Sequence, residues 1–393
     1  MGVRVLRAGG WAAIVLATAA SVYAAEWSAE PAMTVKGIYT SNLLVTPDRV
    51  KAWGYATTPS LKFEGATETL QVSSKLAMDF VEYRGDYDTR FTNVFVPLNM
   101  KYTTEQDTLE FDGGYTRDNT LMGELLATGI VASFTQRNLI TAAPKWTHTV
   151  TERLSLQAGY QFSQASYQDG LRLGLVDYRV HAATGTVQYQ ATERDQLQLT
   201  AVYVDFQTTN LPLRASYPGG FLTAVHNFSE NLTGTVFGGG KFISSSLNTG
   251  GIRGSEESTV WVYGATLKKQ FDRSAVVLEY NRDIVPSGFG LLIKTNRLGL
   301  TLVHRATDTV TVSLDTRAYF TSRASTTATG SRFPDFFHMA VIPRVNWKLD
   351  EHWGIEAGYT FAEFDTESFV RAGQSHSTWL SVSYTFSKWA LSR

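Results

Sequence analysis

The stretch Thr192–Asp205, T-E-R-D-Q-L-Q-L-T-A-V-Y-V-D, decides the fold of this chain. A polar turn at its start leads into a run in which Leu197, Leu199, Ala201 and Tyr203 alternate with other, mostly polar, residues. A period of two is typical of a β-strand with one apolar and one polar face. The stretch therefore predicts an amphipathic strand that follows a tight turn.

The same unit, a short polar turn and an alternating strand, recurs along nearly the whole chain. The predicted turns lie at Thr67-Glu68, Thr104–Asp107, Thr151–Arg153, Thr192–Asp195, Ser229–Asn231, Asp272–Ser274, Thr307–Thr309 and Asp350–His352. Their spacing of about 36 to 47 residues corresponds to one hairpin plus one longer loop, and such a period indicates a propeller, a solenoid or a barrel. Each repeat holds two long strands rather than the four of a propeller blade, which favours a barrel.

The polar face of these strands carries Glu, Asp, Arg and Gln side chains, which the core of a sandwich would bury only at high cost. A barrel with lipid outside and water inside accepts this pattern. Longer, Gly- and Ser-rich connections are expected at Ser244–Glu257, Thr321–Asp335 and Asp365–Ser375. Short periplasmic turns on one rim and long extracellular loops on the other are typical of bacterial outer-membrane barrels.

The predicted fold class is therefore all-β, a transmembrane antiparallel up-and-down barrel of about 18 strands with both termini on the periplasmic side. The number falls to about 16 if a segment such as Thr34–Val45 or Val260–Lys269 is not a strand. Four prolines fall inside strand-like runs, where a missing N–H breaks the ladder, and they are expected to mark strand starts or bulges. They are Pro59, Pro97, Pro144 and Pro343.

The first 25 residues have the composition of a secretory signal peptide. Arg4 and Arg7 form a positive region, Trp11–Ala20 is apolar, and Val22-Tyr23-Ala24 matches a small-residue cleavage pattern. Cleavage is expected after Ala24 or Ala25, which leaves residues 26–393 as a single barrel domain. Because about eight residues, Glu26–Met33, precede the first predicted strand, the plug domain of an energised transporter is not expected.

The composition excludes several classes of protein. The chain has no cysteine, so disulfides, thiolate metal sites and a cysteine nucleophile are absent. After the signal there is no apolar run of about 18 residues, which excludes a helical membrane protein. A formal net charge of −1 without a basic stripe gives no indication of a nucleic-acid partner.

Catalytic and metal-binding patterns are weak. None of the seven histidines has a serine two residues further on, the spacing that would place both side chains on one strand face. Glu256-Glu257, in a predicted loop, are expected to be solvated rather than to bind a divalent cation or bridge lipopolysaccharide, since calcium needs six or more oxygen ligands. We therefore expect no catalytic residue, no metal site and no cofactor.

Several stretches resemble a family of outer-membrane β-barrel porins associated with exopolysaccharide and surface-export systems. They are Tyr39–Asp48 (Y-T-S-N-L-L-V-T-P-D), Tyr115–Gly129 (Y-T-R-D-N-T-L-M-G-E-L-L-A-T-G) and the repeated T-E-R turns. The resemblance spans most of the mature chain and carries no catalytic residues. It implies a place in the outer membrane of a Gram-negative cell and a pore-like role with undefined cargo.

The strand alternation predicts ten charged side chains that point into the lumen. They are Glu110, Arg137, Lys145, Glu279, Arg297, Asp315, Arg317, Arg344, Lys348 and Glu356. Mixed signs with a basic excess either line an aqueous path and tune its selectivity or form salt-bridged plugs with no role in transport. Both interpretations stay open.

The connection Asp118–Thr135 carries four apolar residues at helical spacing, behind Asp118 and Asn119 as possible caps. They are Leu121, Met122, Leu125 and Leu126. They form either a short helix folded into the pore as a constriction or part of two strands that extend beyond the membrane. The run is short for a stable helix, which favours the second.

The predicted function is passive transport through an aqueous lumen, as a porin-like channel or as the barrel of a polysaccharide-export system. Two alternatives are a non-conducting structural or adhesive barrel that acts through its loops and, with less support, a membrane-embedded hydrolase. The expected partners are outer-membrane lipid and lipopolysaccharide, the outer-membrane insertion machinery, and polysaccharide or small hydrophilic solutes. Phe386 matches the terminal aromatic residue that such machinery recognises, but Ser387–Arg393 follows it.

Overall fold

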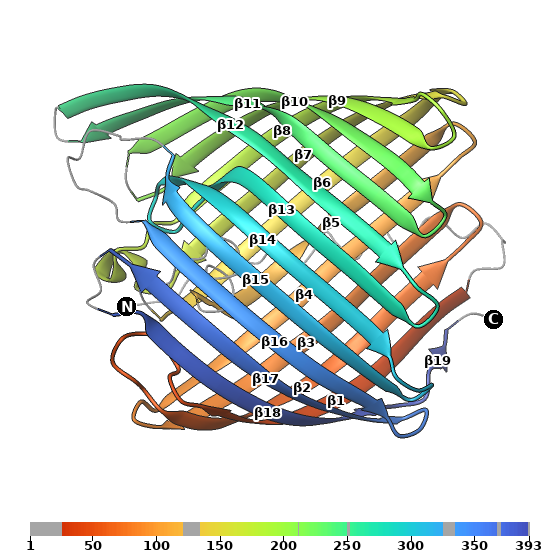
Figure 1. Cartoon of the computed structure of the whole chain (residues 1–393). Coiled ribbons are helices and arrows are strands. Elements are labelled where there is room, and N and C mark those ends of the chain that lie inside the picture. Colours follow the sequence, from red (N-terminus) through yellow and green to blue (C-terminus); the bar gives the residue numbers. More distant parts are fainter. Residues whose placement is uncertain are drawn as a thin grey trace.

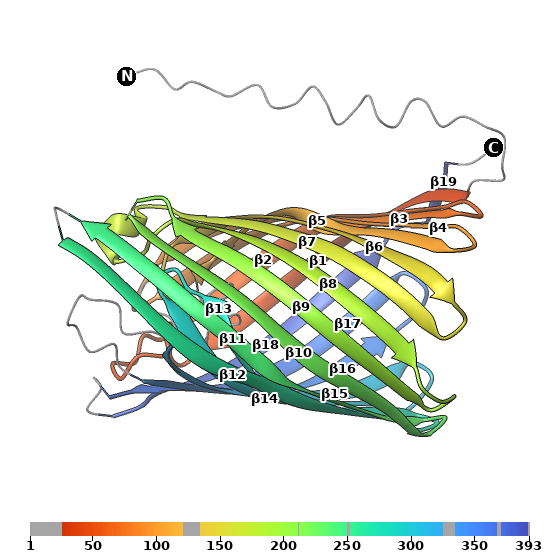
Figure 2. The same cartoon turned by 90° about the horizontal axis from the view of Figure 1, so that it is seen from above.

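The chain forms one closed, tilted antiparallel β-barrel (Figures 1 and 2). The structure is a computed structural model that describes residues 26–120, 134–210, 212–249, 252–324, 335–367 and 371–391. The barrel closes because the first strand pairs with both the second and the eighteenth. The prediction of an all-β, 18-stranded up-and-down barrel is confirmed.

The strands follow one another around the barrel in the order of the sequence. They are β1 (Glu26–Thr40), β2 (Ala52–Ala66), β3 (Leu70–Gly85), β4 (Thr89–Thr103), β5 (Asp107–Asn119), β6 (Gln136–Thr151), β7 (Leu154–Tyr167), β8 (Tyr178–Gln190), β9 (Asp195–Thr208), β10 (Leu213–Ser229), β11 (Leu232–Thr249), β12 (Ile252–Gln270), β13 (Ser274–Pro286), β14 (Leu292–Arg305), β15 (Val310–Arg323), β16 (Phe336–Lys348), β17 (Trp353–Thr366) and β18 (Gly373–Thr385). A two-residue strand, β19 (Trp389–Ala390), and a short 3-10 helix, η1 (Gly170–Leu173), complete the described elements.

All eight predicted short turns connect consecutive strands at one rim, the periplasmic rim, on the right in Figure 1. Side-chain oxygens stabilise several of these turns: Thr192 Oγ1 accepts the N–H of Asp195 at 3.0 Å, and Asp350 Oδ1 accepts that of Trp353 at 2.7 Å. Hydrogen bonds from the N–H groups of Trp353 and His352 hold the pKa of the Asp350 carboxyl below its ordinary value. The polar turn residues therefore determine where each hairpin reverses.

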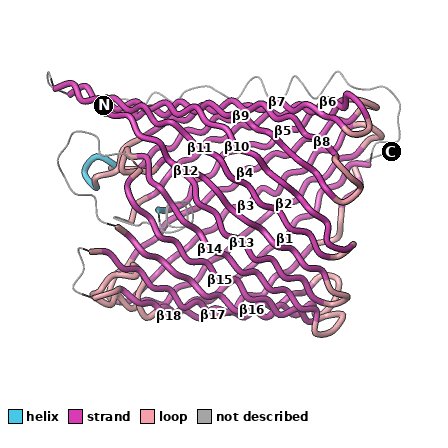
Figure 3. The backbone as a smooth tube through the Cα atoms, turned by 45° about the horizontal axis from the view of Figure 1, so that its top comes forward, coloured by secondary structure: helices cyan, strands magenta, loops and turns pink. Residues whose placement is uncertain are grey.

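Figure 3 shows the strands and loops of the opposite rim, which differs in part from the prediction. The predicted loop Ser244–Glu257 is wrong, because β11 continues to Thr249 and β12 resumes at Ile252 with an unbroken register. Above the membrane a paired strand satisfies its backbone groups without needing an apolar face, so the alternation disappears although the strand continues. Of the expected loops at 321–335 and 365–375, residues 325–334 and 368–370 lie outside the described part. The strands on either side reach into both ranges, since β15 ends at Arg323, β17 ends at Thr366 and β18 begins at Gly373.

The four prolines lie within strands, and the prediction that they mark strand starts or bulges is wrong. At Pro343, for example, β16 stays paired with β15 without interruption. Its ladder with β17 is interrupted between the pair Val341/Phe361 and the pair Arg344/Gly358. The register is the same on both sides of the lapse. Pro59, Pro97 and Pro144 show the same pattern, each with a one-sided lapse and no bulge. Each missing N–H therefore removes bonds on one side only.

Both chain ends take part in closing the barrel. Glu26–Met33, predicted as an arm, is the first half of β1 and pairs throughout with β2. Trp27, Ala29 and Met33 already alternate with Glu26, Ser28 and Glu30, a strand pattern that the prediction missed. After Phe386, β19 continues along β1, where Ala29 faces Trp389. Ser387–Leu391 is thus part of the barrel wall, whereas the predicted signal peptide, residues 1–25, lies outside the described residues.

The outward face of the barrel is apolar. Leu199, Leu222 and Trp261 expose 61%, 54% and 67% of their surface, far more than a soluble protein tolerates in a continuous band. A closed sheet satisfies its own backbone groups, so this apolar band faces the hydrocarbon of the outer membrane. No helix in the described residues is long and apolar enough to span a membrane.

We predict that Leu199→Arg destabilises the barrel by about 2 to 4 kcal/mol, because it places a charge in the lipid-facing band. Gln198→Arg, one residue away on the inward face, is the matched control and is expected to change stability by less than about 1 kcal/mol. Urea unfolding in detergent micelles, followed by tryptophan fluorescence, measures both. Equal effects of the two substitutions would contradict the assignment of the two faces.

Candidate functional site in the barrel lumen

The strand register places all ten predicted lumen charges on the face opposite the exposed apolar side chains. On β15, for example, Leu314 faces Leu302 of β14 on the outward side, while Asp315 faces Thr301 on the inward side. This inward face is the only part of the wall that a solute inside the barrel meets. Whether these residues act on a solute stays a prediction.

Most of the ten charges are held in ion pairs with one another. Lys145 Nζ lies 2.5 Å from Glu110 Oε2, and Arg297 Nη2 lies 3.2 Å from Glu279 Oε1. These side chains remain 29% to 40% exposed, so the pairs line water rather than fill a dry core. Partly exposed pairs add little to stability, and their main consequence is a local pattern of charge along the wall.

Asp315 is the centre of a second group. Its carboxylate receives Arg344, lies 3.9 Å from Arg317 and accepts the hydroxyl of Thr301 at 2.9 Å. Two arginines thus share one carboxylate, which leaves this part of the wall positively charged. Lys348 also points inward, at the periplasmic end of β16. Its cross-strand neighbours are Thr309 on one side and Gly354 on the other.

The inward charges that the prediction missed include Lys36 on β1. Its ammonium lies 4.6 Å from the centre of the Trp379 ring, and Trp379 Nε1 donates to Glu356 Oε1 at 3.2 Å. Lys36, Trp379 and Glu356 therefore form one cluster across the closure of the barrel, next to Arg344 and Asp315. The alternation around Lys36 contained this signal, but its neighbours come from the other end of the chain.

The opposite inner wall is largely apolar, although it carries the ion pair of Lys241 Nζ with Asp283 Oδ1 at 2.6 Å. Buried side chains from β7 to β14 form one cluster that includes Phe206, Tyr217 and Ile243. Two connections of the outer rim fold over this cluster, since Val176 N donates to Gly288 O at 2.6 Å. Gly290, with φ 71°, provides the left-handed turn that this second loop needs. The lumen is therefore narrowed from the apolar side and stays polar on the other.

The predicted constriction residues Leu121, Met122, Leu125 and Leu126 lie outside the described residues. The two ends of their connection are firmly attached to the inner wall. Arg137 donates to Asp118 at 2.7 and 3.0 Å, and both side chains are 7% exposed. Phe134 packs edge-on against Phe91 of β4, whose side chain points inward, at 5.5 Å.

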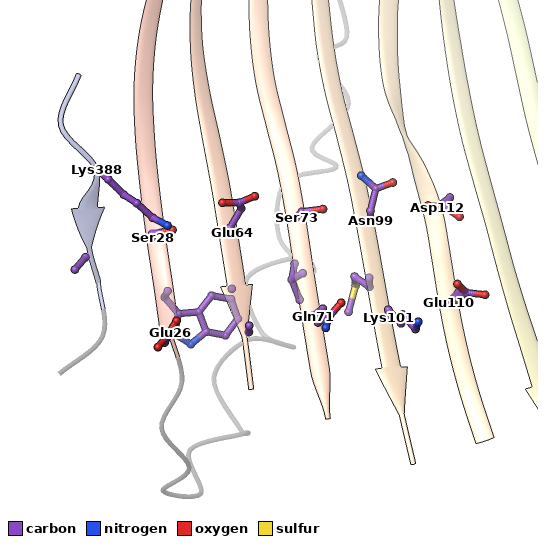
Figure 4. Close-up of a pocket in the computed structure, with 16 residues that line it drawn as sticks. Glu26, Ser28, Glu64, Gln71, Ser73, Asn99, Lys101, Glu110, Asp112 and Lys388 are labelled. Atoms are coloured by element: carbon purple, nitrogen blue, oxygen red, sulfur yellow. The ribbon is translucent and has the colours of Figure 1, made fainter. Parts of the chain in front are cut away.

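Two cavities mark the polar side of the lumen. One, of about 320 Å³, is lined by Lys36, Asp79, Asn93 and Phe134 among others. A larger one, of about 780 Å³, opens at the periplasmic end of β1 to β5. Figure 4 shows its charged and amide side chains, with Glu64, Glu110 and Asp112 opposed by Lys101 and Lys388. The β19 tail, through Lys388, thus contributes to this vestibule.

The histidines form no complete catalytic group in the described residues. His304 Nδ1 lies 2.8 Å from Ser274 Oγ on the neighbouring strand, a pair that a search along single strands misses. No described carboxylate orients that histidine, as a Ser-His-acid triad needs. Among the described residues, no three His, Asp or Glu side chains come together in a way that would hold a metal ion.

The comparisons with known proteins found likeness only in structure. No family model matches the chain, and no curated protein matches its sequence. The chain is similar to Pseudomonas aeruginosa OccK8 (OprE), with 13% identity, a TM-score of 0.45, and 92% of this chain and 98% of that chain covered. It is also similar to Acinetobacter baumannii OccAB3, with 11% identity, a TM-score of 0.43, and 92% and 99% covered.

A third solved structure is P. aeruginosa OccK2 (OpdF) in complex with glucuronate. The identity is 10% and the TM-score 0.43, over 92% of this chain and 98% of that chain. Independently of these likenesses, the closure, the lipid-facing band and the two rims of this chain place it in the class of outer-membrane β-barrels.

We predict that Asp118→Asn costs about 3 to 5 kcal/mol, because it removes a carboxylate from a buried arginine. Glu64→Gln breaks the exposed pair of Glu64 with Lys62, which are 44% and 46% exposed, and is expected to cost less than about 1 kcal/mol. Unfolding in urea compares the two variants. A cost for Asp118→Asn as small as that for Glu64→Gln would show that the pair does not anchor this connection.

Proposed function

We propose that the chain is a passive outer-membrane channel for small hydrophilic solutes. The observation that supports this most is the polar half of the inner wall, where partly exposed charges adjoin cavities of about 320 and 780 Å³. A barrel made only for structural support has no need to keep such charges in contact with water. Binding and selectivity by lumen residues, rather than covalent chemistry, would carry out transport.

The path we propose follows β15 to β18 and β1. A solute entering from outside passes the apolar loops on one side and the group of Asp315, Arg317 and Arg344 on the other. It then meets Lys36 and Glu356 beside Trp379 and leaves through the vestibule of Figure 4. Alternating charges over this length favour polar solutes and disfavour apolar ones. We also propose that residues 1–25 direct export and are then removed.

A narrower hypothesis is that the barrel serves polysaccharide export. It rests on the resemblance of Tyr39–Asp48 and Tyr115–Gly129 to barrels of surface-export systems. The inward loops that carry Val176 and Gly288 narrow the lumen on one side, which favours small solutes over a polymer. The adhesive or structural barrel and the membrane-embedded hydrolase remain competing hypotheses, and the hydrolase has only the pair of Ser274 and His304 in its favour.

Swelling of liposomes that contain the purified protein tests the channel directly. We expect swelling in small sugars and progressively less with larger oligosaccharides, together with discrete conductance steps in planar bilayers. Absence of both would reject the channel in favour of a closed barrel, whereas swelling in long oligosaccharides would support polymer export. Deletion of Leu121–Thr128 should raise the conductance if that connection constricts the pore, and an unchanged conductance would reject the constriction.

Substitution within the Asp315 group tests whether the lumen charges act on the permeating ion. Arg344→Gln removes one positive charge and is expected to shift the cation-to-anion permeability ratio about two-fold toward cations. Asp315→Asn is expected to shift it toward anions by a similar factor. Reversal potentials across a salt gradient at low ionic strength, where screening is weak, measure both shifts. Identical potentials in all three proteins would contradict this path.

A further inference from the structure

The outward face of β7 to β10 changes character in successive rows as it approaches the outer rim. Figure 2 shows these strands side by side across one wall. In one row, Leu156, Val187, Leu199 and Leu222 face one another across the strands. Two rows further out stand Tyr160, Ala183, Tyr203 and Pro218. Tyrosines at this position mark the boundary between hydrocarbon and headgroups.

Beyond the tyrosines, the outward rows become polar. The next row holds Phe162, His181, Asp205 and Ser216, and the outermost holds Gln164, Arg179, Gln207 and Arg214. We call this outermost row, with Asp205, the arginine ledge. It lies directly outside the aromatic boundary, at the level where lipid headgroups surround a barrel.

Hydrogen bonds hold the ledge in place. Arg214 donates Nε and Nη2 to the two oxygens of Asp205 at 2.9 and 3.2 Å, and Gln207 donates to Asp205 at 2.6 Å. Arg179 Nε donates to the amide oxygen of Gln164 at 3.1 Å. Since a guanidinium has five N–H donors, both arginines retain donors that point away from these partners. Arg214 remains 63% exposed, whereas Asp205 is 13% exposed.

The acids near the ledge are already engaged. Asp177, one row further out than Arg179, accepts the N–H of Tyr167 at 2.8 Å, and the carboxylate of Asp205 accepts three hydrogen bonds. Along the row of Asp205, the neighbouring strands carry Ser216 on β10 and Ser244 on β11. The next acid in that row is Glu257 on β12. Arg179 and Arg214 stand on strands two apart, so their Cα atoms are separated by about 10 Å, twice the spacing of neighbouring strands.

We propose that the arginine ledge binds the phosphate groups of an outer-leaflet glycolipid that carries two phosphates on its headgroup. Each guanidinium offers a planar pair of donors that matches a phosphate, and two such pairs about 10 Å apart suit two phosphates of one headgroup. The acyl chains then lie along Tyr160, Tyr203 and the apolar rows below. This lipid site is independent of transport through the lumen.

A second pair of outward arginines provides the contrast. Arg84 and Arg90 both bind Glu82 near the outer end of β3 and β4, at 2.5 and 2.9 Å. Two further acids, Asp86 and Asp88, lie in the adjoining turn, where they accept the N–H groups of Lys51 and Gly85. The acids there outnumber the arginines. Removing Arg84 and Arg90 therefore deletes the same number of charges from a place that should hold no phosphate.

Native mass spectrometry of the mature chain in detergent micelles tests the proposal. The probes are bisphosphorylated lipid A, phosphatidylglycerol, phosphatidylcholine and inorganic phosphate. We expect the wild type to retain lipid A in preference to the other three, and the double variant Arg179→Gln/Arg214→Gln to bind it about ten-fold more weakly. Arg84→Gln/Arg90→Gln should bind it as the wild type does, and added salt should weaken binding.

Equal losses in the two double variants, or no loss in either, would overturn the proposal. Equal retention of phosphatidylcholine or of inorganic phosphate would also overturn it, because neither carries a lipid headgroup with two phosphates. Heat-modified electrophoretic mobility confirms that each variant is folded. If the double variant does not fold, Arg179→Gln and Arg214→Lys replace it, since the lysine keeps the charge but loses the paired donors.

Discussion

The structure depends on one constraint: within the membrane, every backbone N–H and C=O must find a partner in the chain itself. Closure of the sheet between β1 and β18 satisfies this, and it requires residues more than three hundred positions apart to pair in register. The β19 tail extends the same closure, since the N–H of Leu391 reaches the carbonyl of Trp27 at 2.8 Å. Residues 387–391 therefore belong to the barrel wall.

The prolines show how narrowly this constraint is met. Each one removes ladder bonds toward a single neighbour and leaves the register unchanged, because its own carbonyl and its other neighbour remain paired. A bulge would shift every following side chain to the other face, which would send apolar residues into the lumen and charges into lipid. The loss of a few hydrogen bonds on one side of a strand disturbs this sheet less than a bulge would, because one face contacts lipid and the other contacts water.

Closure also organises both polar surfaces of the barrel. Inside, it brings Lys36 of β1 to Trp379 of β18, and so creates a charged wall opposite the apolar loops. Outside, the register aligns Arg179 and Arg214 in one row with two glutamines. The channel that we propose and the lipid site that we infer both follow from the alternation of inward and outward side chains along the strands. The channel uses the inward face and the lipid site uses the outward face.

The sequence by itself determined the architecture. The period of two shows on which face of the sheet each side chain lies, and the eight polar turns show where each hairpin reverses. For the same reason, the sequence showed that the side chains of Glu110 and Arg344 point into the lumen. Only the tertiary structure decided that Glu110 pairs with Lys145, that Asp315 gathers Arg317 and Arg344, and that β11 and β12 continue beyond the membrane. Pairing across strands and the path of the inward loops depend on contacts between distant parts of the chain, which a local pattern does not contain.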